Sequence, residues 1–189
     1  MRELSLHILD ILENSVEAGA TRIEIVIDED MEADRMTIEV ADNGRGMTTE
    51  MAKAVLSPFV TTRKTRHVGL GLPLLAAAAR RCAGDLTIES EIGKGTRITA
   101  TFRHSHVDRA PLGDVPTALI AILLSEHPVD LGFTHKVNSE EFQFDSAEIR
   151  QELEDVPLTH PLVRPWLLET LNEGEASLRA NRPQTRITL

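Results

Sequence analysis

One stretch of the 189-residue sequence constrains the fold more than any other, because Ile23, Ile25 and Ile27 recur at every second position. Side chains on a β-strand point to opposite faces in turn, so this period predicts a strand over residues 22–28 with one strongly buried face. Similar alternation recurs at residues 36–41, 85–90 and 96–102. A sheet that buries one face needs a second layer packed against that face.

Helical periodicity accompanies these strands. Leu4, Ile8, Ile11 and Leu12 lie on one side of a predicted helix over residues 4–18, which Gly19 is suited to end. Two more helices are predicted at residues 48–56 and 71–82. The order helix, strand, strand, helix, helix, strand, strand predicts an α+β fold. We expect a two-layer α/β sandwich with a mixed, mainly antiparallel sheet.

The remainder of the chain is predicted to form a small α+β C-terminal domain. Residues 105–116 are polar and contain Pro111, Gly113 and Pro116, so we expect a linker after a first domain at 1–104. The second domain, residues 117–180, should contain helices at 117–124, 146–153 and 161–178 and strands at 131–136 and 141–144. Residues 181–189 are expected to be a disordered tail.

Charge limits the possible partners. The formal net charge of −10 argues against nucleic acid or an anionic membrane as the main partner. Residues 105–189 carry 7 basic and 14 acidic side chains, which suggests either a docking surface for a basic protein or ordinary solubility. The single cysteine, Cys82, excludes an internal disulfide, and no apolar run reaches the ~20 residues of a membrane span. We therefore expect a cytoplasmic protein.

The first predicted helix carries a polar stripe. Glu3, His7, Asp10, Asn14 and Glu17 recur at intervals of three and four, so they share one face. In isolation such a stripe is more often a solvated face. Four glycines in two later motifs favour a binding site instead.

Those glycines occur in two motifs. The run Asp42-Asn43-Gly44-Arg45-Gly46-Met47 follows a predicted strand and, taken alone, would be an ordinary turn. The run Val68-Gly69-Leu70-Gly71-Leu72-Pro73 opens a predicted helix, whose first amide groups can receive an anion. Three cations and three hydroxyls precede it within residues 61–67, and among the cations Arg63 and Lys64 are the candidates for phosphate contact. This segment is predicted to be a lid over phosphates.

Together with the stretch 13–21, these two motifs resemble the ATP site of the GHKL superfamily, which includes gyrase, heat-shock chaperones, histidine kinases and mismatch-repair ATPases. The resemblance covers residues 3–103 and implies a Bergerat-type ATP-binding fold with ATP and Mg²⁺ as ligands.

The resemblance also implies a role for individual residues. Asn14 would coordinate magnesium, and Asp10 would be the general base, although most hydrolysing members carry the longer glutamate there. Asp42 would accept a hydrogen bond from the adenine amino group. The remaining predicted nucleotide contacts are Ala18, Gly44, Gly46, Met47, Arg63, Lys64, Gly69, Leu70, Gly71, Leu72 and Thr96.

Three functions remain open at this stage. The first is an ATP-driven switch or ATPase that acts on a protein partner. The second is a protein kinase that phosphorylates a partner in trans. The third is a non-catalytic nucleotide-sensing subunit of a larger, possibly redox, complex, which the shortened carboxylate of Asp10 favours.

Overall fold

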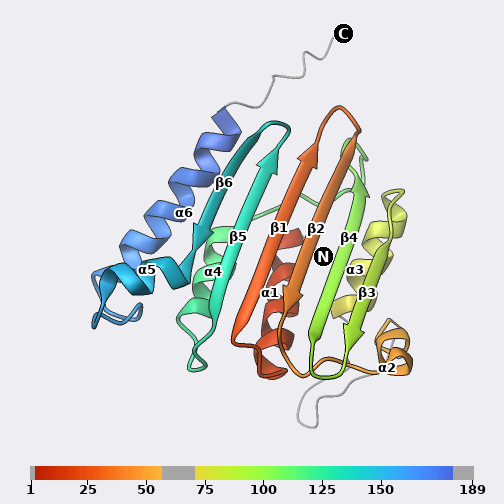
Figure 1. The fold of residues 1–189 in the computed structure, drawn as a ribbon. Helices are drawn as coiled ribbons and strands as arrows, with labels where there is room; N and C mark the ends of the chain where they lie inside the picture. The colour runs from red at the N-terminus through yellow and green to blue at the C-terminus, as the bar shows by residue number, and fades with distance from the viewer. Residues whose placement is uncertain (1–2, 57–70, 181–189) are drawn as a thin grey trace.

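An antiparallel hairpin formed by residues 22–42 lies at the centre of the sheet (Figure 1). The computed structural model describes residues 3–56 and 71–180. Its elements, in chain order, are α1 (Leu4–Glu17), β1 (Arg22–Asp30), β2 (Arg35–Asp42), α2 (Thr49–Ala54), α3 (Gly71–Arg81), β3 (Leu86–Glu91), β4 (Gly95–Arg103), α4 (Val115–Leu123), β5 (Asp130–Val137), β6 (Glu140–Asp145), α5 (Ser146–Leu153) and α6 (Val163–Ala180).

The strands form one six-stranded sheet in the order β3-β4-β2-β1-β5-β6. All neighbouring strands are antiparallel except β1 and β5, which are parallel. Ile25 of β1 therefore lies between Val40 of β2 and Phe133 of β5. The predicted mixed, mainly antiparallel sheet is confirmed.

Helices cover one face of this sheet. Figure 1 shows α1, α3 and α4 on the same side, behind the strands in that view. The isoleucines predicted to point inward on β1 are 0–1% exposed. Helix α4 is almost entirely apolar and buried, and it contacts both α1 and α6. The predicted two-layer sandwich is thus observed.

The C-terminal strands join the same sheet, which differs from the separate small domain expected at residues 117–180. Strand β5 pairs along the free edge of β1, and one apolar core runs from α1 through α4 to α6. An unpaired strand edge is a strong template for pairing, and β5 brings a buried face of its own. The segment 105–116, expected to be a linker, packs on the molecule, since Pro111 and Leu112 accept hydrogen bonds from the amides of Leu4 and Ser5.

The expected disordered tail lies outside the described residues. Within the part of the chain that the structure describes, no helix combines the length and apolar character needed to cross a membrane.

Candidate functional site

Three of the predicted contact residues, Asp42, Thr96 and Ala18, lie at one end of the sheet. Strand β2 ends at Asp42 and β4 begins at Gly95, and the register places Asp42 opposite Thr96. These two strand ends lie at the bottom of Figure 1. Ala18, which follows the last residue of α1, meets the loop after β2, because its carbonyl accepts a hydrogen bond from the amide of Arg45.

The carboxylate of Asp42 is held by two hydrogen bonds. The Ser15 hydroxyl donates to Oδ2 at 2.9 Å, and the amide of Gly44 donates to Oδ1 at 2.8 Å. Ser15 is buried in α1, so the helix fixes the orientation of this acid. Each carboxylate oxygen has two lone pairs, and Asp42 retains capacity to accept from a ligand.

Close backbone packing explains the glycines of the loop. A Cβ at Gly44 would lie 2.9 Å from the Cβ of Ala18. A Cβ at Gly46, whose φ is +66°, would lie 1.9 Å from the carbonyl oxygen of Glu91. The loop after β2 therefore packs closely on Ala18 and on the end of β3, and this packing requires glycine at both positions.

Ser90 links two other predicted contact residues. Its hydroxyl accepts a hydrogen bond from the amide of Met47 at 2.8 Å and lies 2.9 Å from Oγ1 of Thr96. The same hydroxyl lies 3.0 Å from the carbonyl of Gly95. Ser90 thus holds Met47 and Thr96 together. Neither Ser90 nor Ser15 carries a signal in the sequence that marks it as part of the site.

Asp10 lies at the other part of the site, where α1 meets α3. Its Oδ2 would be 3.2 Å from a Cβ added to Gly71, the first residue of α3. Asp10 is half-buried and Asn14, one turn further along the same helix, is exposed. The amide oxygen of Asn14 is a ligand type that Mg²⁺ takes together with phosphate oxygens.

His7 is an unusual neighbour of Asp10. It is 3% exposed, and its Nδ1 is buried without a hydrogen-bond partner in the described part of the chain. Burial, helped by the positive N-terminus, lowers the pKa of His7 to about 4, while a backbone hydrogen bond with Gly71 acts in the opposite direction. His7 is therefore neutral at neutral pH and ties α1 to the start of α3. Its place on the polar stripe was the only signal for it in the sequence.

Four predicted contact residues, Arg63, Lys64, Gly69 and Leu70, lie outside the described residues. Gly71 and Leu72 are the first two residues of α3.

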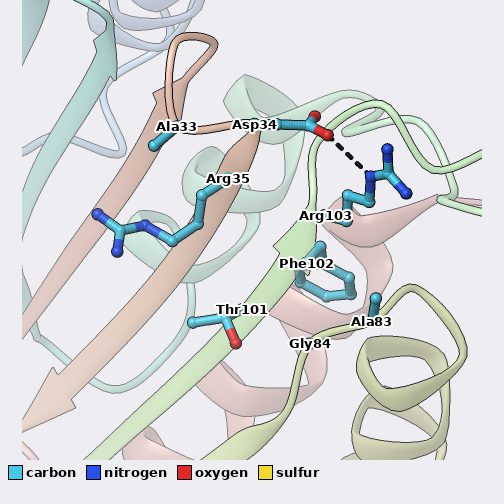
Figure 2. A pocket seen from close by; sticks show the side chains of 8 residues that line it. All are labelled: Ala33, Asp34, Arg35, Ala83, Gly84, Thr101, Phe102 and Arg103. Atoms are coloured by element: carbon cyan, nitrogen blue, oxygen red, sulfur yellow. Dashed lines mark hydrogen bonds and ion pairs between the residues drawn. The ribbon is translucent and has the colours of Figure 1, made fainter.

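A hollow lies at the opposite end of the sheet, where β2 begins and β4 ends (Figure 2). It has a volume of about 340 Å³. Its acidic group, Asp34, is already used by Arg103, whose Nε lies 2.8 Å away, and by Ser105. These hydrogen bonds lower the pKa of Asp34 to about 2. This hollow holds none of the predicted site residues.

The known proteins that resemble this chain match its N-terminal part, which contains the residues described above. A family described as histidine kinase-, DNA gyrase B- and HSP90-like ATPases matches residues 2–106. Sporulation kinase C of Bacillus subtilis (strain 168) is 36% identical over 88 residues, which are 47% of this chain and 20% of the kinase. Sporulation kinase D of the same organism is 33% identical over 95 residues, 50% of this chain and 19% of the kinase. The matched segment thus spans about a fifth of these relatives.

A solved structure described as the N-terminal domain of a DNA repair protein has the same fold. It superimposes with a TM-score of 0.51 at 14% identity and covers 75% of this chain and 51% of its own.

Proposed function

The chain belongs to the family of histidine kinase-, DNA gyrase B- and HSP90-like ATPases, and from that premise we propose that it is a magnesium-ATP-binding protein whose nucleotide state acts on a protein partner. Its ATPase domain is similar to the corresponding part of bacterial sporulation kinases.

The anchored carboxylate of Asp42 is the observation that carries this proposal. Ser15 and Gly44 hold it where the end of α1, the loop after β2 and the end of β3 pack closely together. A carboxylate accepts a hydrogen bond from the amino group of adenine and repels the carbonyl that guanine has in its place. The site therefore favours ATP over GTP.

At the phosphate end, Asn14 would hold magnesium through its amide oxygen. The bound ion would neutralise charge on the phosphates. Asp10 lies one turn earlier, beside the start of α3, and its part would be to orient or deprotonate an attacking water. The amide groups that open α3 are suited to receive phosphate oxygens.

A protein kinase acting on a partner is the second candidate. The similarity to two proteins named sporulation kinases favours it. In that case Asp10 would act on an acceptor side chain in place of water. The partner, of whichever kind, is proposed to contact the acidic C-terminal part of the chain.

Incubation with γ-labelled ATP distinguishes these activities. Free phosphate that disappears in Asp10→Asn supports hydrolysis with Asp10 as base. Label carried by protein in an added cell extract supports a kinase. ATP binding with neither product supports a nucleotide-sensing subunit and rejects hydrolysis. If the protein binds no ATP by calorimetry, the proposal itself is wrong.

Asn14→Ala should make ATP binding independent of magnesium. We expect the affinity measured with magnesium to fall to the affinity measured with a chelator present, roughly a tenfold loss, because the metal loses its protein ligand. ADP binding should change less. Calorimetric titration with ATP and ADP, with and without magnesium, measures this.

Glu13→Ala is the matched control for this variant. Glu13 is the preceding residue, equally exposed, and points about 100° away around the helix. It should keep the magnesium dependence. Loss of that dependence in both variants would mean that the metal effect is general electrostatics and not ligation by Asn14.

A further inference from the structure

Three buried titratable side chains and one half-buried histidine form a cluster at the end of the sheet away from Asp42. The cluster consists of Glu29 near the end of β1, His104 just after β4, His135 on β5 and Glu175 on α6. Glu29, His135 and Glu175 are 2%, 1% and 3% exposed. None of the four belongs to the proposed nucleotide site.

His135 lies between two carboxylates. Its Nδ1 is 2.7 Å from Oε1 of Glu175, and its Nε2 is 3.1 Å from Oε1 of Glu29. The other oxygen of Glu29 lies 2.7 Å from Nε2 of His104. Both nitrogens of one imidazole ring therefore face acceptors.

This geometry requires a proton on each ring nitrogen of His135. A neutral imidazole donates from one nitrogen only, so its other nitrogen would turn a lone pair toward a carboxylate oxygen. In a site closed to water, that repulsion and the second carboxylate charge would be uncompensated. With both nitrogens protonated, His135 donates to Glu29 and to Glu175, and both contacts are favourable.

Apart from His104, which faces the second oxygen of Glu29, the surroundings place little positive charge near the two carboxylates. Helix α4, which packs on β5, has no charged residue, and β6 places Phe142 opposite His135. Arg179 of α6 lies 4.0 Å from the second oxygen of Glu175, and its side chain is mostly exposed. No group of three or more His, Cys, Asp or Glu side chains in the described ranges is arranged to hold a metal ion.

We propose that this cluster is a proton-operated latch, in which the proton on His135 holds α6 against the sheet and its loss at higher pH releases the helix. Glu175 is the buried charged residue of α6, among Leu167, Leu171 and Leu178 on the same buried face. The latch thus joins this helix to β5 and, through Glu29, to β1. The proposal is independent of nucleotide binding.

The direction of the pH effect follows from the contacts. Burial alone would lower the pKa of His135, but the hydrogen bonds to Glu175 and Glu29 outweigh it and the pKa lies above its ordinary value of 6.5. The latch therefore contributes its full stabilisation below pH 6.5 and loses it as the pH rises through the raised pKa. For one proton, the docking equilibrium changes by up to about tenfold per pH unit in that window.

Amide hydrogen exchange of the full chain at several pH values, corrected for intrinsic rates, tests the latch. Protection of α6 should fall by up to about tenfold per pH unit above pH 6.5, while protection of α1 stays constant. In Glu175→Gln, the new amide can donate to Nδ1 of a neutral His135 whose Nε2 still donates to Glu29. The pH dependence of α6 should then disappear.

Glu173→Gln is the matched control, because Glu173 lies on the same helix, is exposed and loses the same charge. It should behave as the wild type does. A constant protection of α6 in the wild type, or the same pH dependence in Glu175→Gln, would overturn the proposal.

A measurement on the wild-type protein does not require that any variant folds. The nitrogen-15 spectrum of the wild-type imidazoles at pH 6, below the ordinary histidine pKa of 6.5, should show both ring nitrogens of His135 protonated, with the resonances assigned through the neighbouring ring of Phe133. One protonated nitrogen would reject the latch.

Discussion

Replacement of Asp42 by Asn is expected to weaken ATP binding by on the order of 100-fold or more, because an amide that turns its NH₂ toward the adenine amino group pairs two donors. The amide oxygen can still accept from Gly44 or Ser15, so the loop should keep its conformation. Calorimetric titration of ATP into wild type and variant measures the change, and the thermal unfolding temperature should stay close to that of the wild type.

Glu39→Gln is the control for Asp42→Asn. Glu39 lies on the same strand and forms an ion pair with Arg97. The substitution makes the same charge change on β2, and it should leave ATP affinity unchanged. Equal affinity of Asp42→Asn and wild type would show that Asp42 is not the adenine acceptor and would remove the main support for the proposed site.

Gly95→Ala is expected to destabilise the protein by roughly 3 kcal/mol or more. The φ of Gly95 is +101°, and an added Cβ would lie 1.9 Å from the carbonyl oxygen of Asp42. The collision is with backbone, so no side chain can move aside, and β2 and β4 would have to separate beside the nucleotide site. Urea unfolding measures the loss in stability, and ATP affinity should fall with it.

Gly93→Ala measures the cost of a left-handed backbone conformation without a steric collision. Gly93 lies in the same turn with a φ of +79°, but nothing lies within 4 Å of its would-be Cβ. This variant should lose only about 1 kcal/mol, the usual cost of a left-handed conformation for alanine. Equal destabilisation of the two variants would show that the approach of Gly95 to Asp42 has no energetic consequence.

Local patterns in the sequence predicted the elements well, since burial repeats every second residue in a strand and every three or four in a helix. The predicted strand over 22–28 is an example, and it also shows what a local hydropathy pattern misses. The observed β1 continues to Asp30 because Glu29, although charged, occupies the next inward position. Hydropathy alone cannot reveal a buried acid whose partners are distant in sequence.

The same limit applies to long-range pairing. Nothing local shows that β5 lies parallel to β1, since its alternating pattern would suit a separate small sheet equally well. Ser15 and Ser90 likewise resemble ordinary serines until the fold places them against Asp42, Met47 and Thr96. The motifs predict the chemistry of the proposed site, whereas the serines that contact its residues are recognised only in the three-dimensional arrangement.

The parallel pairing of β1 with β5 has a consequence for synthesis on the ribosome. Strand β1 emerges early, but β5 follows only after three further strands and the helices α2, α3 and α4. Until then, the outer edge of β1 stays open beside Ile23, Ile25 and Ile27 and can pair with a neighbouring nascent chain. A gene fragment that stops after β4 would keep this edge open permanently. Expression of the nucleotide-binding half should therefore yield aggregates unless β5 is included.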